Sequence, residues 1–324
     1  MHLKHIFMNL MLNNYCNLNC EYCFANQVME KDKQNISLHN ILKVLDFLNK
    51  SDLNHISIIG GEPTLHPEFV EILNILSAQK FLKSILIFTN GIFKNHILDA
   101  ILKLSDIKKV SILINYNDPQ IIREERNKKL LHNLHELAKR NIDLTLGINI
   151  YRHNQDYNYI IEKSKELGLK NLRWSLVVPN GVSKADFNVR GYFEGYKAEI
   201  IKFLVNCREN NIQPHVDCNN IPLCLYDDEE FKKIVFLNNN SISACYPIID
   251  ILPDLSVIRC FALSEERKAK LLDFKNKKEL DEFFIKHIDE RYSSLPLFDE
   301  CTNCISYIMK NKSCGCIAYK LNKS

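Results

Sequence analysis

Short apolar segments alternate with amphipathic stretches along the first half of this 324-residue chain. The spacing predicts six strands, over 6–12, 55–59, 84–88, 110–115, 143–150 and 171–178. It predicts helices over 38–50, 67–79, 93–104, 119–140 and 156–167, and a sixth helix over 192–210. Strands that alternate with helices in this way form parallel βαβ units. Right-handed crossovers curl such units into a partial (β/α)6 barrel, so the predicted fold class is α/β.

Three cysteines follow the first predicted strand in C-x3-C-x2-C spacing: Cys16, Cys20 and Cys23. Ligands of α/β proteins bind at the carboxyl ends of parallel strands, which is where this loop begins. Cysteine thiolates hold cubane iron–sulfur clusters. Three close thiolates bind three irons and leave the fourth iron open to a small molecule. The alternatives are a zinc knuckle, in which His39 folds back as a fourth ligand, and three unrelated cysteines.

The second predicted strand runs directly into Gly60, Gly61, Glu62 and Pro63. Two glycines let the backbone approach a ligand closely, and the glutamate adds an acceptor for an ammonium group. The same residues also suit a plain turn. The segment follows the cysteine loop with one predicted helix between them. Because the two motifs occur in this order, together they are stronger evidence for a cluster and ligand site than either motif alone.

The two motifs together resemble the radical S-adenosylmethionine (radical SAM) superfamily, with Tyr22 in the aromatic position of the cysteine motif. The resemblance implies that the three cysteines hold a catalytic [4Fe-4S] cluster. It also implies that residues 60–63 bind the methionine amino group of SAM, with Tyr22 among the cofactor contacts. The expected fold is the radical SAM barrel, in agreement with the alternation of strands and helices.

The resemblance points to further SAM contacts at strand ends. Thr89 and Asn90 close the third strand on the open face. Asn115 ends the fourth strand, where relatives often place a Ser or Asn against the ribose. Arg123 or Arg126 could bind the SAM carboxylate, although the loop before them is shorter than in the usual pattern. The alternatives are turn chemistry for Asn115 and a solvated helix face for each arginine.

Asn149 and Arg173 also lie near predicted strand ends and are weaker candidates. Trp174, the only tryptophan, suits the core better than a substrate platform. Cys207 lies on the apolar part of the sixth predicted helix. It suits packing as a small hydrophobic residue, and the alternative is a thiol that donates a hydrogen atom, as in epimerising relatives.

The last third of the chain is rich in cysteine, and its eight cysteines are Cys218, Cys224, Cys245, Cys260, Cys301, Cys304, Cys314 and Cys316. Segment 249–260 predicts a β-hairpin with its turn at 253–256 and a cysteine near each arm. This part resembles the SPASM/Twitch extension of radical SAM enzymes, which carries one or two auxiliary [4Fe-4S] clusters. The resemblance implies that the eight cysteines are cluster ligands.

The chain departs from the SPASM/Twitch pattern at Leu255, where the pattern favours Gly, and at the narrow Cys-Gly-Cys spacing of the last pair. A zinc ribbon is the alternative. The predicted domains are a radical SAM core over 1–180, a bridging helix over 181–210 and a small cysteine-rich α+β auxiliary-cluster domain over 211–324.

Composition limits the remaining classes. A net charge of +3 is too small to argue for nucleic acid or a membrane as a partner. The sequence has no signal peptide and no apolar run long enough to span a bilayer, so we expect a cytoplasmic protein. In a reducing compartment twelve cysteines suggest metal ligands rather than disulfides.

The expected function is that of a radical SAM enzyme, which cleaves SAM reductively and uses the 5′-deoxyadenosyl radical to abstract a hydrogen atom. The resemblance favours a peptide or protein substrate over a small molecule. The first strand begins near the N-terminus and leaves no room for a fused leader-peptide domain, so a separate recognition protein is a possible partner. Flavodoxin or ferredoxin would supply electrons. The non-catalytic alternative is an iron–sulfur electron carrier, which would not need residues 60–63.

Overall fold

The computed structural model describes residues 8–23, 25, 29, 32–140, 142–177, 187–217, 221–230, 232, 248–305 and 315–323. The chain divides into two compact units. The first unit comprises Met1–Thr145 and Pro247–Ile285, and the second comprises Leu146–Tyr246 and Lys286–Ser324. The predicted limits of the functional domains, at 180 and 210, stay a prediction.

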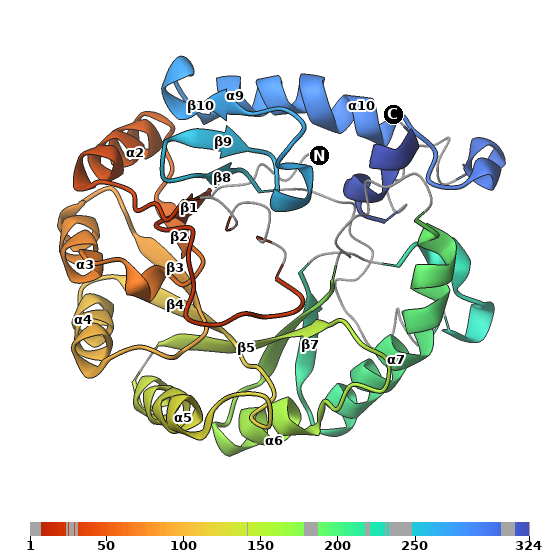
Figure 1. The fold of residues 1–324 in the computed structure, drawn as a ribbon, viewed down its shortest axis with the longest axis horizontal. Coiled ribbons are helices and arrows are strands. Elements are labelled where there is room, and N and C mark those ends of the chain that lie inside the picture. Colours follow the sequence, from red (N-terminus) through yellow and green to blue (C-terminus); the bar gives the residue numbers. More distant parts are fainter. Residues whose placement is uncertain are drawn as a thin grey trace. The chain divides into compact units, whose positions relative to one another are not determined.

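In the first unit the strands lie in the order β10-β9-β8-β1-β2-β3-β4 (Figure 1). The central four are parallel: β1 (Asn9–Met11), β2 (His55–Ile59), β3 (Ser84–Thr89) and β4 (Lys109–Asn115). Burial alternates along β3 and β4, so one set of side chains packs under the helices. The predicted α/β class is confirmed. The first strand was predicted from residue 6, and residues 6 and 7 lie outside the described residues.

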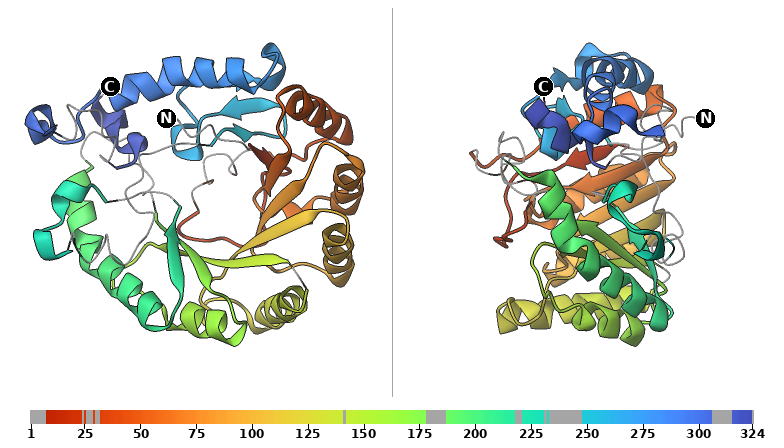
Figure 2. Two further views of the ribbon diagram at one scale, coloured as in Figure 1. Left: turned by 180° about the vertical axis from the view of Figure 1, so that it is seen from behind. Right: turned by 90° about the vertical axis from the view of Figure 1, so that its right-hand side faces the viewer.

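The helices of the first unit include α2 (Leu38–Lys50), α3 (Phe69–Ala78), α4 (Asn95–Ser105), α5 (Glu124–Ala138) and α9 (Lys277–Phe284). Figures 1 and 2 show α2, α3 and α4 side by side on one face of β1–β4. Ser37 caps α2, because its side chain accepts a hydrogen bond from the Asn40 amide at 3.2 Å. The helix predicted from residue 119 begins at Glu124, because Asp118 accepts a hydrogen bond from the Gln120 amide and holds a turn there.

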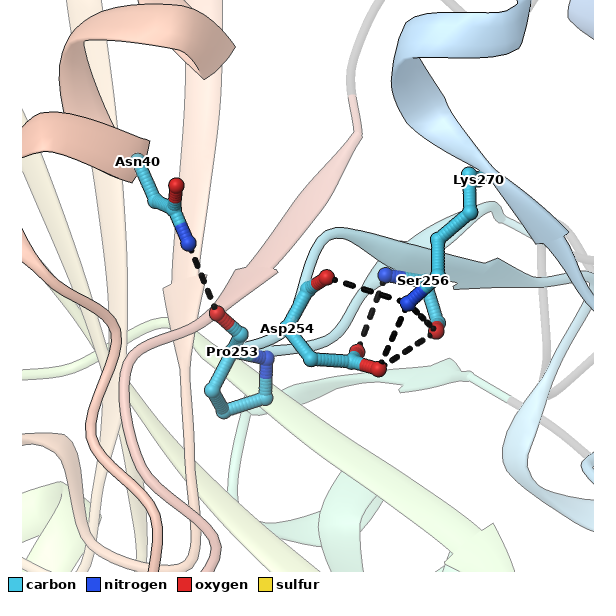
Figure 3. A network of polar contacts seen from close by, with 5 residues as sticks. All are labelled: Asn40, Pro253, Asp254, Ser256 and Lys270. Carbon is cyan, nitrogen blue, oxygen red and sulfur yellow. Dashed lines mark hydrogen bonds and ion pairs between the residues drawn. The ribbon is translucent and has the colours of Figure 1, made fainter.

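The predicted hairpin is present as β8 (Asp250–Ile251) and β9 (Ser256–Ile258), with β10 (Ala269–Lys270) beside β9. β8 also pairs with β1 in parallel, so the hairpin extends the sheet that carries the cysteine loop. Figure 3 shows the turn, in which the Asp254 carboxylate bonds Ser256 and Lys270 while the Pro253 carbonyl accepts from Asn40.

Leu255 occupies the left-handed region of backbone conformation in that turn, at φ +62°. This conformation is available to glycine without steric cost, and it explains physically why a glycine is favoured at this position.

In the second unit β5 (Asp143–Ile150), which crosses the unit boundary, pairs in parallel with β6 (Asn171–Leu176), and β6 pairs with β7 (Gln213–Val216). The helices are α6 (Asn158–Glu166), α7 (Val189–Glu209) and the short α10 (Glu290–Ser293). Gly168 follows α6 at φ +68°, as expected of a C-terminal cap. β7 was not predicted from the sequence.

Trp174 on β6 is buried, and its ring lies edge-on to Phe203 of α7 with centroids 6.1 Å apart. This position fits the core assignment that the sequence favoured. Within the described residues, no helix combines the length and the apolar character that crossing a membrane requires.

Candidate iron–sulfur and SAM site

The cysteine loop and the Gly-Gly-Glu-Pro turn are held together by backbone hydrogen bonds. The amide of Gly61 donates to the Asn13 carbonyl, and the amide of Glu62 donates to the Tyr15 carbonyl, both at 2.9 Å. Asn13 is fully buried, and its side-chain amide donates to the Glu62 carbonyl at 2.9 Å. The two motifs that the sequence places one helix apart are therefore a single structural element.

The two glycines permit this close approach. A Cβ on Gly61 would lie 2.2 Å from the carbonyl oxygen of Tyr15, and a Cβ on Gly60 would lie 2.4 Å from Oδ1 of Asn13. Sequence reasoning assigned the close approach to a ligand, whereas here the neighbour is the cysteine loop itself. Binding of SAM by residues 60–63 stays a prediction.

Glu62 joins the carboxyl ends of β2 and β3. Its side chain is almost fully buried and accepts hydrogen bonds from the Thr64 hydroxyl at 2.6 Å, the Thr89 hydroxyl at 2.7 Å and the Asn90 amide at 2.8 Å. Burial raises the pKa of the carboxyl, and these hydrogen bonds oppose the shift. Glu62 and Thr89 therefore organise the strand ends, and Glu62 Oε2 accepts one hydrogen bond within the described residues.

The three cysteines of the loop are half-buried. Burial raises the pKa of the Cys16 thiol to about 11, and the charges of Glu62, Cys20 and Cys23 add to this effect. The Leu18 amide, 3.3 Å from Cys16 Sγ, acts in the opposite direction. Burial also raises the pKa of Cys20 and Cys23. Because the charged thiolates repel one another, a cation that binds all three of them stabilises their deprotonated form.

A polar network surrounds Cys16. The Asn90 side-chain amide donates to Asn17 Oδ1 at 2.7 Å and lies 3.7 Å from Cys16 Sγ. Arg126 donates to the Asn17 carbonyl at 2.8 Å, whereas Arg123 is exposed at the start of α5. Of the two arginines considered for the SAM carboxylate, Arg126 is the one that contacts the cysteine loop.

Tyr22 donates a short hydrogen bond to Oδ1 of Asn117, a buried residue in the loop after β4. This bond ties the aromatic position of the cysteine motif to the end of the fourth strand. Sequence reasoning did not single out Asn117, and its position just past the strand end is the signal that could have done so.

Asn115 offers an observation that fits a bound cofactor. Its Oδ1 atom is buried and has no hydrogen-bond partner within the described residues. An unsatisfied buried acceptor is costly, and a ligand hydroxyl would satisfy it. The half-buried thiols and this acceptor both suit the predicted cluster and SAM. Within the described residues no three His, Cys, Asp or Glu side chains converge as ligands of a single metal ion would.

An apolar cluster supports Cys23. It consists of Met11, Ala25, Ile59, Ile258 and Phe261, and the half-buried Cys23, Met29, Phe88 and Leu252 pack against it. Ile258 and Phe261 flank Cys260, so the segment that carries Cys260 packs in the same cluster as Cys23.

The predicted auxiliary ligands are described in part. Cys218, Cys245 and Cys314 lie outside the described residues. Cys260 belongs to the first unit, and Cys224, Cys301, Cys304 and Cys316 belong to the second. Cys301 and Cys304 share one short turn, in which the Cys304 amide donates to the Cys301 carbonyl at 3.0 Å. Ligation by these cysteines stays a prediction.

The weaker candidates have partners in the second unit. Arg173 donates to Asn149 Oδ1 at 2.9 Å and pairs with Asp217. Cys207 is fully buried on α7, and burial raises the pKa of its thiol to about 12. An inert, protonated thiol at this position agrees with a packing role.

Comparison with known proteins agrees with this geometry. Residues 10–162 match the model of the radical SAM superfamily. GTP 3′,8-cyclase of Alkaliphilus oremlandii is 32% identical over 120 residues, which are 36% of this chain and 37% of the relative. 7-Carboxy-7-deazaguanine synthase of Clostridium acetobutylicum is 37% identical over 76 residues, which are 24% of this chain and 34% of the relative. The chain thus matches little more than a third of the length of either relative.

The solved structures that match nearly the whole chain include two with bound SAM. Streptococcus suis SuiB bound to S-adenosylmethionine superposes with a TM-score of 0.61 at 18% identity, over 97% of this chain and 73% of SuiB. anSMEcpe with bound AdoMet superposes with a TM-score of 0.64 at 15% identity, over 96% of this chain and 88% of that protein. At this level of identity the likeness establishes the fold, which confirms the predicted fold class.

Residues 10–162, a little under half of the chain, therefore carry a radical SAM domain. The class of enzyme that this domain defines uses SAM and a [4Fe-4S] cluster.

Proposed function

We propose that the chain binds its [4Fe-4S] cluster through Cys16, Cys20 and Cys23 and uses it to cleave SAM reductively. When bound, the cluster and SAM supply a 5′-deoxyadenosyl radical that takes a hydrogen atom from the substrate. The observation that carries the proposal is the joining of the cysteine loop to the Gly-Gly-Glu-Pro turn at the carboxyl ends of β1 and β2.

The protein residues then hold and orient the cofactor. Asn115 Oδ1 accepts a hydrogen bond from a ribose hydroxyl. Tyr22, fixed by Asn117, stands among the cofactor contacts, and Arg126 joins Arg123 as a candidate for the SAM carboxylate. Glu62, Thr89 and Asn90 hold the strand ends in place.

The substrate we propose is a peptide or protein. Support comes from the solved structures that match nearly the whole chain, which include SuiB bound to its precursor peptide SuiA and anSMEcpe bound to the Kp18Cys peptide. A small molecule is the second candidate, since the sequence relatives include GTP 3′,8-cyclases. The predicted domains over 1–180, 181–210 and 211–324 belong to this proposal, as do one or two auxiliary clusters on the C-terminal cysteines.

One experiment separates the two substrate classes. Reconstituted protein is incubated with SAM and dithionite, and 5′-deoxyadenosine is measured without substrate, with GTP and with a synthetic cysteine-containing peptide. Acceleration by the peptide, with deuterium transferred from labelled peptide into 5′-deoxyadenosine, supports the peptide proposal. If GTP instead accelerated 5′-deoxyadenosine formation, and deuterium from labelled GTP entered 5′-deoxyadenosine, a nucleotide would replace the peptide as the proposed substrate.

A further inference from the structure

A cavity of about 460 Å³ lies beside the cysteine loop in the first unit. Asn17, which follows Cys16, forms part of its wall. The remaining wall comes from the turn after β2, the turn after β3 and the first turns of α3, α4 and α5. The cavity therefore lies where β2 and β3 end and the helices α3, α4 and α5 begin, next to a residue of the cysteine loop.

The lining is cationic. Lys94, Arg126 and Lys129 line the cavity, and Glu125 is the one acidic side chain among the lining residues. Lys94 is exposed and Lys129 is half-buried, and neither forms an ion pair within the described residues. The chain as a whole carries a net charge of only +3, so this concentration of positive charge is local.

Three helix ends border the cavity. Residues of the first turns of α3, α4 and α5 line the cavity, and none of these helices has a side-chain hydrogen bond at its N-cap. The N-caps of α6 and α10, outside the cavity, also lack such a bond, whereas α2, α7 and α9 are each capped by a side chain. The N-terminal end of a helix carries a partial positive charge. Glu71 offsets this charge in the first turn of α3, as do Glu124 and Glu125 in the first turn of α5. The first turn of α4 has no acidic residue, so this helix end attracts the same kind of group as the lysines.

Arg126 connects the cavity to the cluster loop. Its guanidinium donates to the Asn17 carbonyl at 2.8 Å, so a group held in the cavity lies against the loop that carries Cys16. The function proposed above requires one electron per SAM cleaved, and a donor outside this chain must supply that electron. Electron transfer between proteins needs close approach of the two redox centres, and the cavity offers that approach.

We propose that this cavity docks an acidic one-electron donor protein, whose surface carboxylates enter between Lys94 and Lys129. The reduced flavin or iron–sulfur centre of the donor loses one electron and the cluster gains it, with no bond formed or broken. The proposal rests on the function proposed above. Attraction between opposite charges raises association rates by about 10-fold to 1,000-fold at low salt, so the docking surface controls the rate of electron delivery.

The test uses reconstituted full-length protein and two reductants. Reduced, acidic flavodoxin is the docking probe, and dithionite is a small reductant that needs no docking surface. The variant is Lys94→Glu with Lys129→Glu. The control is Lys128→Glu, because Lys128 lies on the same helix, outside the cavity lining, and pairs with Glu124 at 2.7 Å. Arg126 is left in place because it contacts the cluster loop.

We expect the double variant to lose about tenfold or more of the flavodoxin-driven rate of SAM cleavage at low salt, and the loss to shrink as salt rises. The control variant should stay within about twofold of the wild type, and the dithionite-driven rate and the iron content should be unchanged. The milder Lys94→Gln, Lys129→Gln variant should show a smaller loss in the same direction.

Several results would overturn the docking proposal. A double variant that flavodoxin reduces at the wild-type rate would do so, and so would an equal loss in Lys128→Glu, which would reflect net charge alone. A matching loss with dithionite would mean that the lysines act on the cluster rather than on a partner. Failure of the wild type to cleave SAM with dithionite is a separate outcome, since it contradicts the proposed function itself.

Discussion

Replacement of Gly61 by alanine tests whether the cysteine loop depends on the Gly-Gly-Glu-Pro turn. The added methyl group would lie 2.2 Å from the Tyr15 carbonyl oxygen, 2.3 Å from its carbonyl carbon and 2.8 Å from its amide nitrogen. Ordinary contacts between non-bonded heavy atoms are about 3.5–4.0 Å, so the two backbone segments must separate by about 1 Å. No side chain can rotate away, because all three neighbours are backbone atoms.

The cost follows from that displacement. Forced insertion of a methyl group into a packed region costs about 1–3 kcal/mol, and a clash with backbone belongs at the upper end. The shift also stretches the hydrogen bond between the Glu62 amide and the Tyr15 carbonyl, now 2.9 Å. Tyr15 directly precedes Cys16, so we expect Gly61→Ala to lose about 3 kcal/mol of stability and much of its bound iron.

Urea denaturation and iron quantification after anaerobic reconstitution measure the two effects. Gly168→Ala is the matched control, because Gly168 has φ +68° with nothing within 4 Å of an added Cβ. It should lose about 1–2 kcal/mol through backbone strain and keep its iron. A Gly61→Ala protein with wild-type stability and full iron would show that the cysteine loop does not depend on this turn.

Three further predictions concern single side chains. Asn115→Ala should leave stability nearly unchanged and raise KM for SAM about tenfold in the SAM-cleavage assay, because its buried oxygen has no partner among the described residues. Asn133→Ala is its control, and it should lose about 2 kcal/mol of stability because Asn133 donates hydrogen bonds to the carbonyls of Gly91 and Phe93. If wild type and Asn115→Ala had equal KM values for SAM, the ribose contact would be excluded. Cys207→Ala should preserve both 5′-deoxyadenosine and product formation in a turnover assay, whereas loss of product alone would identify a hydrogen-atom donor. His66 should make stability depend on pH: burial lowers its pKa from 6.5, its Nε2 lies 2.9 Å from the Ile36 carbonyl, and its Nδ1 accepts from the Glu68 amide. Its contribution is full above pH 6.5 and is lost as the pH falls, so urea denaturation of the His66→Gln apoprotein should show a flatter pH dependence than the wild type, and equal slopes would contradict this assignment.

Sequence reasoning located the elements of the first unit because their periods are regular. The helix predicted over 38–50 was confirmed at both ends, since Ser37 provides a cap and the apolar residues recur with helical spacing. The start of α5 was missed because the turn at Asp118 depends on one side-chain hydrogen bond. β7 was missed because a four-residue strand that contains a proline gives little periodic signal.

The sequence identified residues of the candidate site but not the contacts between them. The cysteines and residues 60–63 stand out by spacing, but the contact between Gly61 and Tyr15 joins residues far apart in the chain. The same holds for Arg126 and Asn17, and for Tyr22 and Asn117, which are hydrogen-bonded across different loops. The pairing of β8 with β1 was also not predicted, because a two-residue strand does not specify its neighbour.

The most direct test of the central claim is the formation of 5′-deoxyadenosine from SAM by the anaerobically reconstituted protein with dithionite. We expect wild-type protein to form 5′-deoxyadenosine and a variant with Cys16, Cys20 and Cys23 all replaced by alanine to form none. Wild-type protein that holds an intact [4Fe-4S] cluster, confirmed by spectroscopy, yet forms no 5′-deoxyadenosine would contradict the claim.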